Sequence, residues 1–218
     1  MRIGICGGTF DPFHRGHLDP ILHARAAMQW DRVIYVPAYR QPFKTDRTTA
    51  SGPHRFAMAV LATIDDARLF VSDIELERGA ISYTVDTLEA LRSRHPDDTL
   101  DWVIGDDNLA QLLEWKSIDR ILELANFVVL TRGAAGFSPP EPVGGLKPAA
   151  PPALASRVVG PDDRSTHGAI VFAENPTVPV SSTEIRRRLG ANEPIDDLVA
   201  PLVSRYIHHY GLYRKDPS

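Results

Sequence analysis

The 218-residue sequence holds a single cysteine, Cys6, so a disulfide within the chain is excluded. Cys6 ends a short apolar run with Ile3 and Ile5, where we expect its side chain to be a small core residue. Long hydrophobic runs are missing too, because none approaches the roughly 18 residues of a membrane-spanning helix. The first residues also lack the apolar stretch of a signal peptide. We therefore expect a soluble, cytoplasmic protein with no membrane partner.

An excess of positive charge is also missing. The formal net charge is -4 at pH 7, and the chain is 43% hydrophobic and 24% charged. These proportions are typical of globular proteins, and the negative balance does not support general binding to nucleic acid. The length suits one sizeable core with, at most, a small appended subdomain.

Several common catalytic and binding signatures are absent. The chain has no G-x-x-x-x-G-K-[ST] segment, which excludes a P-loop NTPase. It has no G-x-G-x-x-G after a strand, which argues against a dinucleotide-binding dehydrogenase. It has neither a G-x-S-x-G nucleophile elbow nor a C-x-x-C pair. A phosphate-binding turn can therefore come only from the segment 7–17.

The N-terminal segment Met1–Asp19 has the pattern of such a turn. Ile3–Cys6 is typical of a buried strand, Gly7 and Gly8 break it, and apolar residues recur at helical spacing from Gly16 onward. A turn that leads from the carboxyl end of a strand into a helix N-terminus is the natural anion site of an α/β protein. Glycines let backbone N–H groups approach a phosphate, because no Cβ stands in the way.

Two histidines of this turn, His14 and His17, are spaced so that they lie on one face of a first helical turn. An H-x-x-H pair suits zinc, but a zinc site needs a third protein ligand and none is evident nearby. The side chains could instead stabilise the turn, or donate hydrogen bonds to phosphate where the helix dipole favours negative charge. The pattern favours phosphate contact over the other two roles.

Strands and helices alternate along the chain, and most of the expected strands are continuously apolar. Such strands are typical of a parallel sheet covered on both faces, and right-handed crossovers make the fold a doubly wound α/β structure. We expect the ligand at the carboxyl ends of the strands, where 7–17 and 105–108 both fall. The expected strands are 3–6, 32–36, 69–71, 100–104, 127–130 and 169–172; the expected helices are 18–28, 53–64, 84–91, 118–122, 181–190 and 201–210, with one more after 108.

The sequence predicts two structural parts. Residues 1–180 are expected to form the α/β domain. Within it, 134–168 is rich in proline, alanine and glycine and is predicted to be a flexible insertion, with a lid as the alternative. Residues 181–218 are expected to form a small helical subdomain, whose first helix begins with Ser181 and Glu184 in a capping-box pattern.

Two segments far apart in the chain resemble the signatures of one enzyme family. Gly8–His17, GTFDPFHRGH, resembles the G-T-F-D-P-x-H-x-G-H motif of the adenylyl- and cytidylyl-transferases. Val180–Arg186, VSSTEIR, is similar to their second motif, I-S-S-T-x-I-R. The resemblance implies a Rossmann-like nucleotidyltransferase fold in which both segments frame one site for a nucleoside triphosphate and Mg²⁺. Residues 181–218 would then complete the ATP site of the nucleotide-binding domain 1–180.

The remaining chain, apart from 134–168, resembles the bacterial nicotinate-nucleotide adenylyltransferases. One departure is Phe43, which precedes Lys44 where that family often has a histidine, so Lys44 alone is the phosphate-binding candidate there. The matching segments are Ser82–Thr84 (S-Y-T), Ile104–Asp107 (I-G-x-D), Trp115 at the spacing of the family's aromatic residue, Thr131–Gly133 at its basic turn and Gly211–Arg214 at its closing G-L-Y.

The resemblance implies an enzyme that joins ATP to nicotinate mononucleotide, giving nicotinate adenine dinucleotide and pyrophosphate in NAD biosynthesis. The 5′-phosphate would attack the α-phosphorus of ATP directly, without a catalytic base. The implied catalytic residues are His14, His17 and Arg186. The implied ATP-binding residues are Gly7, Gly8, Thr9, Phe10, Asp107, Arg132, Ser181, Ser182 and Ile185, and those for the second substrate are Lys44, Tyr83, Thr84 and Trp115.

Alternatives remain open for individual residues and for the substrate. Trp115 could be a core tryptophan, and Arg186 could belong to a solvated helix face shared with Arg187 and Arg188. The second substrate could be nicotinamide mononucleotide, or phosphopantetheine as in the pantetheine-phosphate adenylyltransferases, although that family usually has threonine at His14 and shorter chains. A nucleotide-binding module without catalysis is a further interpretation, which the intact motif residues disfavour. The oligomeric state, including a homo-oligomer, is left open.

Overall fold

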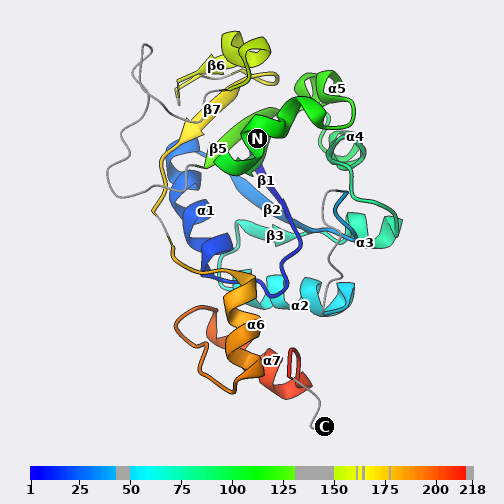
Figure 1. The fold of residues 1–218 in the computed structure, drawn as a ribbon. Coiled ribbons are helices and arrows are strands. Elements are labelled where there is room, and N and C mark those ends of the chain that lie inside the picture. Colours follow the sequence, from blue (N-terminus) through cyan, green and yellow to red (C-terminus); the bar gives the residue numbers. More distant parts are fainter. Residues whose placement is uncertain (43–49, 131–149, 161, 164, 177, 215–218) are drawn as a thin grey trace. The chain divides into compact units, whose positions relative to one another are not determined.

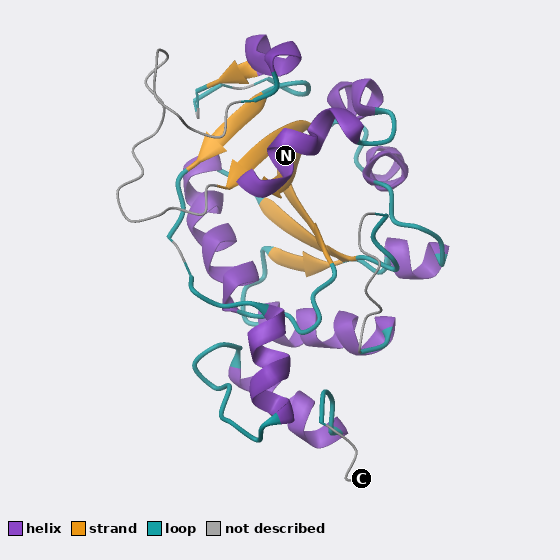
Figure 2. Cartoon of the chain, in the orientation of Figure 1, coloured by secondary structure: helices purple, strands orange, loops and turns teal. Residues whose placement is uncertain are grey.

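The computed structural model describes residues 1–42, 50–130, 150–160, 162–163, 165–176 and 178–214. Helices and strands alternate along this part of the chain (Figure 2). The strands are β1 (Arg2–Gly8), β2 (Arg32–Pro37), β3 (Leu69–Val71), β4 (Thr99–Gly105), β5 (Asn126–Leu130), β6 (Val158–Val159) and β7 (Ile170–Ala173). The α-helices are α1 (Arg15–Met28), α2 (Gly52–Thr63), α3 (Ile74–Arg78), α4 (Thr84–Arg94), α5 (Ile118–Leu124), α6 (Ser182–Gly190) and α7 (Pro201–Tyr210), and the 3-10 helices are η1 (Asp106–Glu114) and η2 (Pro152–Arg157).

The strands form one sheet in the order β3-β2-β1-β4-β5-β7-β6 (Figure 1). The pairs β1–β4, β4–β5, β5–β7 and β6–β7 are parallel. From β1 the chain builds the sheet first toward β3 and then, from β4 on, toward the other edge. A doubly wound α/β sheet binds its ligands where the strand order reverses in this way. The doubly wound, mainly parallel α/β fold expected from the sequence is confirmed.

Burial explains why the strands are continuously apolar in sequence. Ile3 and Ile5 of β1 and residues 127–129 of β5 are fully buried. Helical crossovers between parallel strands cover both faces of such a sheet, so side chains on both faces lose contact with water. The strands thus form the apolar centre on which the helices pack, and the segments after their carboxyl ends are left to carry polar chemistry.

All six expected strands are confirmed, but three short elements were not predicted. These are α3, η2 and β6, and periodicity carries little information over so few residues. The last two lie within 134–168, the predicted flexible insertion, of which 134–149 lies outside the described residues. The helix expected after 108 is the 3-10 helix η1. Among the helices of the described ranges, none combines the length and hydropathy that a membrane span requires.

The chain divides into two compact units. The first comprises Met1–Cys6, Pro20–Val33 and Tyr83–Thr177; in it, α4 packs against α5. The second comprises Gly7–Asp19, Ile34–Ser82 and Val178–Ser218; in it, α7 packs against α2. The histidine turn near the start of the chain and the helices at its end therefore belong to the same unit.

A buried carboxylate joins three strand segments of the first unit. Asp101 of β4 is fully buried and accepts hydrogen bonds from the Arg2 guanidinium (Nε to Oδ2, 2.6 Å) and the Trp30 indole (Nε1 to Oδ2, 2.6 Å). The Asn126 amide on β5 donates to the other carboxylate oxygen at 2.9 Å. Because its donors lie on β1, on β5 and before β2, this one side chain helps to hold the strands in register.

We predict that Asp101→Ala lowers the free energy of unfolding by about 3–5 kcal/mol, because it leaves the part-buried Arg2 charge without its counter-ion. Chemical denaturation followed by circular dichroism measures the change. The control Asp97→Ala removes an exposed carboxylate from the same unit and is expected to change the stability by less than about 0.5 kcal/mol. A loss at Asp101 as small as the loss at Asp97 would contradict the prediction.

Candidate active site

Aromatic packing holds the turn between β1 and α1. Phe10 has a left-handed backbone conformation with φ of 53°, which a bulky residue rarely keeps without support from its surroundings. Its ring lies 5.2 Å from the Phe13 ring and 5.9 Å from the Tyr35 ring, measured between centroids. Phe10, Phe13 and Tyr35 are all buried. The packing gives the turn a defined shape.

Glycines at two positions permit this packing. A Cβ on Gly8 would lie 2.7 Å from the Phe10 ring. A Cβ on Gly16 would lie 3.0 Å from the His14 ring and 3.0 Å from Cγ1 of Val180. Contacts this short force the neighbouring group to move, so only glycine lets the aromatic rings and the segment before α6 approach so closely.

The two histidines of the turn stack on each other. Their ring centroids are 3.7 Å apart and the ring planes differ by 24°. His14 is buried, whereas His17 is half-buried. The His14 backbone N–H donates to Nδ1 of His17 over 3.3 Å, so a neutral His17 carries its proton on Nε2 and presents that nitrogen as a donor. The stacking holds the two imidazoles side by side at the turn.

Helix α6 brings the second motif to this turn. The Ser182 hydroxyl donates to the carbonyl oxygen of Pro12 at 3.1 Å, across 170 positions of sequence. Nη1 of Arg186 donates to the carbonyl oxygen of Asp11 at 2.6 Å, across 175 positions. The two motifs, which the sequence shows only as separate segments, are therefore in direct contact within the second unit.

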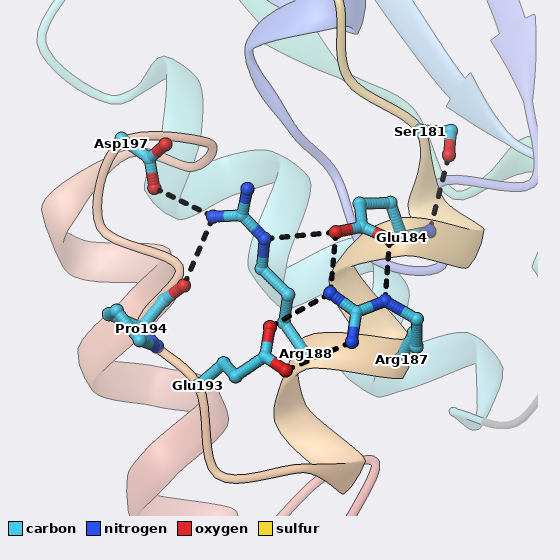
Figure 3. A network of polar contacts seen from close by, with 7 residues as sticks. All are labelled: Ser181, Glu184, Arg187, Arg188, Glu193, Pro194 and Asp197. Atoms are coloured by element: carbon cyan, nitrogen blue, oxygen red, sulfur yellow. Dashed lines mark hydrogen bonds and ion pairs between the residues drawn. The ribbon is translucent and has the colours of Figure 1, made fainter.

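The start of α6 is capped by Ser181, as the sequence predicts. The Ser181 hydroxyl accepts the Glu184 backbone N–H over 3.2 Å (Figure 3). The Glu184 carboxylate binds the guanidinium groups of Arg187 at 2.8 Å and Arg188 at 3.1 Å. These hydrogen bonds, first that from Arg187, lower the pKa of Glu184 to about 2. The Glu184 carboxylate thus binds two guanidinium groups rather than a backbone N–H, because charged donors form the stronger hydrogen bonds.

The network extends from α6 to the loop that follows it. Arg187 also pairs with Glu193 at 2.8 Å, and Arg188 pairs with Asp197 at 3.3 Å (Figure 3). Arg186 behaves differently, because it donates to two uncharged oxygens, the Asp11 carbonyl and, at 3.3 Å, the Thr183 hydroxyl. Within the described ranges Arg186 forms no ion pair. Its charge therefore faces the turn without a carboxylate partner, as the charge of a phosphate-binding arginine does.

The buried carboxylate of Asp11 is the centre of a second group of contacts at the turn. Its Oδ1 accepts the Tyr213 hydroxyl at 2.6 Å and the Ala50 backbone N–H at 3.2 Å. Arg55 of α2, only 1% exposed, donates to the Thr9 carbonyl at 2.7 Å and the Ala50 carbonyl at 3.3 Å. Burial lowers the pKa of Arg55, and the negative charge of Asp11 opposes that shift. Burial also raises the pKa of Tyr213, and Asp11 acts in the same direction.

Sequence reasoning assigned no role to Asp11, Arg55 or Tyr213. Asp11 and Tyr213 lie inside recognised motif segments, but no local pattern shows that residues 202 positions apart meet. Arg55 lies within an apolar helical pattern, which is a weak signal for a buried arginine. A buried arginine differs from a solvated one in its tertiary contacts and not in its spacing.

Three residues assigned to the second substrate lie in the first unit. Tyr83 occupies the N-cap position of α4 and Thr84 is its first residue. Nζ of Lys116 lies 4.5 Å from the centroid of the Tyr83 ring, a cation–π contact. Trp115 is half-buried and meets the ring of the fully buried Phe127 edge-on, at a centroid distance of 5.9 Å. Its indole thus contacts the core and is also open to solvent.

The other assigned residues differ in their surroundings. Asp107 is exposed at the start of η1, and its Oδ1 accepts the Asn108 amide at 3.0 Å. Ile185 is fully buried, so its side chain packs into the interior. Lys44 and Arg132 lie outside the described residues. Among the described residues, the assigned side chains therefore gather most clearly at the histidine turn and at α6.

The groups gathered at the turn are those that bind phosphate. Two imidazoles and a guanidinium donate charge-assisted hydrogen bonds to phosphate oxygens and stabilise negative charge. A glycine-containing turn before a helix adds backbone donors. Positioning and charge stabilisation of this kind are the main requirements of phosphoryl and nucleotidyl transfer.

Comparison with known proteins agrees with this chemistry. Residues 5–188 match the family described as cytidylyltransferase-like, so the fold and the site define a nucleotidyltransferase. The chain is 36% identical to the "Probable nicotinate-nucleotide adenylyltransferase" of Thermoanaerobacter sp. (strain X514), covering 99% of this chain and 96% of that one. A protein of the same name from Roseiflexus sp. (strain RS-1) is 38% identical, over 97% and 98%. The chain belongs to the nicotinate-nucleotide adenylyltransferase family.

A solved structure supports the fold. It is the Plasmodium falciparum nicotinic acid mononucleotide adenylyltransferase complexed with NaAD, with a TM-score of 0.67 and 20% sequence identity. The match covers 97% of each chain. The Rossmann-like nucleotidyltransferase fold implied by the motifs is therefore confirmed.

We predict that Gly16→Ala lowers the adenylyltransferase kcat by about 10- to 100-fold, because the added Cβ displaces the His14 ring. The change in the free energy of unfolding should be small, because the helical advantage of alanine over glycine, about 0.5–1 kcal/mol, opposes the cost of the close contacts with His14 and Val180. Steady-state kinetics and chemical denaturation measure the two quantities. Gly160→Ala is the control, because nothing lies within 4 Å of a Cβ at that position. Equal kcat values for the two variants would show that the close approach at Gly16 is unimportant.

Proposed function

We propose that the enzyme joins ATP and nicotinate mononucleotide to give nicotinate adenine dinucleotide and pyrophosphate, a step of NAD biosynthesis. The observation that carries the proposal is the contact of α6 with the histidine turn, through Ser182 to Pro12 and Arg186 to Asp11. Both phosphate-binding motifs thereby belong to one compact unit. The names of the relatives, and the complex of the Plasmodium enzyme with NaAD, support the choice of substrates.

In this proposal the triphosphate of ATP lies between the turn and α6. The backbone of Gly7–Phe10 cradles the phosphates, Nε2 of His17 donates to the α-phosphate, and His14 contacts the triphosphate beside it. Arg186 binds the β- and γ-phosphates and then the departing pyrophosphate. Ser181 and Ser182 lie at the N-terminus of α6, where the helix dipole favours negative charge.

The transfer proceeds without a covalent intermediate. The 5′-phosphate of the mononucleotide attacks the α-phosphorus of ATP, the bond from that phosphorus to the bridging oxygen breaks, and pyrophosphate leaves. A phosphate monoester is already a nucleophile at neutral pH, so no general base is needed. The protein supplies alignment, which can contribute roughly 7–11 kcal/mol, and stabilisation of the charge that develops at the α-phosphate.

The pyridine nucleotide is proposed to bind at Trp115 and at the start of α4. An indole that is half open to solvent can stack on a pyridine ring. The backbone N–H groups of Tyr83 and Thr84 begin a helix and suit the carboxylate that nicotinate has and nicotinamide lacks. This difference is the basis for proposing the acid rather than the amide as substrate.

Mg²⁺ is proposed to enter as part of the ATP substrate. The described residues contain no group of three or more His, Cys, Asp or Glu side chains that could hold a metal ion. The acidic side chain of the turn, Asp11, is bound by Tyr213 and Ala50. Mg²⁺ commonly takes its ligands from substrate phosphates and water, so it fits a site whose own contribution is positive charge. His17 and Arg186 would share the neutralisation of the triphosphate with the ion.

The remaining assignments are also proposals. Asp107 would hold the ribose or adenine, Arg132 would bind ATP, and Lys44 would bind the phosphate of the second substrate. Residues 181–218 would act as the subdomain that completes the ATP site of domain 1–180, which the contacts of Ser182 and Arg186 support. We also propose that the enzyme works in the cytoplasm.

We predict that His17→Ala and Arg186→Ala each lower kcat by about 10²–10³, because each removes a donor to charge that develops in the transition state. A pyrophosphate-release assay measures kcat, and circular dichroism checks that the variants fold. Arg187→Ala is the matched control: it removes the same charge one residue away, from a surface network with Glu184 and Glu193. Its kcat should stay within about twofold, since exposed ion pairs contribute little. A near-normal rate for His17→Ala would contradict the proposed role.

We predict that nicotinate mononucleotide is the preferred second substrate with ATP and Mg²⁺. The same assay, run in parallel on nicotinate mononucleotide, nicotinamide mononucleotide and phosphopantetheine, compares the three values of kcat/KM. A higher value for either competitor would replace the proposed substrate. Binding of ATP without turnover of any of the three would identify a nucleotide-binding module instead of an enzyme.

A further inference from the structure

The segment after α7 turns back toward the histidine turn. Gly211 ends α7 with φ of 62°, and Tyr213 is left-handed as well, with φ of 65°. A tyrosine in this region is strained, and such a conformation persists where other contacts hold it. Phe10, directly before Asp11, is also left-handed. The contact therefore joins Tyr213, itself left-handed, to the residue that follows the left-handed Phe10, and such backbone positions are common at functional sites.

The contact itself is short and partly buried. The Tyr213 hydroxyl donates to Oδ1 of Asp11 at 2.6 Å, the length expected for a hydroxyl bound to a carboxylate. Burial raises the pKa of Tyr213, so the phenol keeps the proton that it donates. The buried guanidinium of Arg55 stabilises the charge on Asp11 from the side of α2. The carboxylate thus accepts a hydrogen bond from the phenol and interacts through its charge with the guanidinium.

The backbone of Asp11 also binds Arg186. The Asp11 carbonyl accepts Nη1 of Arg186 at 2.6 Å, and the next carbonyl, that of Pro12, accepts the Ser182 hydroxyl at 3.1 Å. The side chain bound by Tyr213 and the two carbonyl acceptors thus belong to two adjacent residues of the turn. A group that holds the carboxylate can therefore also restrain the backbone that binds Arg186.

We propose that Tyr213 is a positioning residue for nucleotidyl transfer: by holding the Asp11 carboxylate, it sets the carbonyl that orients Arg186 and the turn that carries His14 and His17. This inference rests on the proposed function and extends it, because it gives the end of the chain a part in catalysis although Tyr213 touches no substrate. The predicted consequence is a loss of rate with little change in the binding of the pyridine nucleotide.

The first test is Tyr213→Phe, which keeps the ring and removes only the hydroxyl. We expect kcat to fall about tenfold and KM for nicotinate mononucleotide to stay within about twofold, since misorientation acts mainly on the transition state. The matched control is Tyr206→Phe, which removes a hydroxyl bound to Nδ1 of His54 at 2.9 Å in the same unit. Its kcat should be unchanged. Wild-type kcat in Tyr213→Phe would overturn the inference.

A double-mutant cycle with Asp11→Ala, which removes the oxygen that accepts the Tyr213 hydroxyl, separates positioning from general stability. If Tyr213 acts through the carboxylate, Tyr213→Phe has no further effect on kcat once Asp11→Ala is present. Multiplied losses, or a lowered melting temperature with unchanged kcat per folded molecule, would overturn the inference. If Tyr213→Phe does not fold, Asp11→Ala alone carries the test: we expect a loss of kcat at least as large with unchanged KM for nicotinate mononucleotide, and a wild-type kcat would overturn the inference.

The inference and the proposed function can fail separately. If Arg186→Ala loses activity while Tyr213→Phe keeps the wild-type rate, the proposed function stands and the positioning role is wrong. If the wild-type enzyme does not use nicotinate mononucleotide, the proposed function fails. Binding of a non-hydrolysable ATP analogue then tests Tyr213, because a misplaced Arg186 should weaken that binding about tenfold. Unchanged binding would overturn the inference.

Discussion

Asp11 is bound both through its side chain and through its backbone, and the rest of the candidate site depends on these bonds. Its carboxylate accepts the Tyr213 hydroxyl, and its carbonyl accepts Arg186. Both partners come from the end of the chain, so the two motifs become one site only when these contacts form. Hydrogen bonds to charged groups contribute about 1.5–3 kcal/mol each, a large share of the stability of a typical domain. Arg55, buried beside the turn, stabilises a carboxylate that would otherwise be costly to bury.

Three consecutive arginines of α6 differ in the partners that they bind. Arg187 and Arg188 are neutralised by Glu184 and by carboxylates of the following loop. Arg186, rotated to another side of the helix, meets carbonyl and hydroxyl oxygens instead. The surface network holds the helix and its loop together, while Arg186 keeps a charge that can act on phosphate. Arginines that are neighbours in sequence therefore have different surroundings.

The strands were predictable because buried parallel strands are continuously apolar, a property of short segments. β6 and α3 were not, since two and five residues carry too little pattern. At α6 the cap Ser181 was predicted from the capping-box pattern. The reciprocal role of Glu184 was not realised, because the nearby guanidinium groups are stronger partners for its carboxylate. The competing partners are three and four residues along the same helix, so here one local interaction replaced another.

The sequence by itself determined the alternating α/β fold, the phosphate-binding motifs and so the family, since periodicity and motif residues belong to contiguous segments. Only the tertiary structure decided that His14 stacks on His17, that Tyr213 holds Asp11 and that Arg186 faces the turn. These contacts depend on side-chain direction and burial. Spacing along the chain encodes neither for residues that lie on different elements, because both are set by how the elements pack.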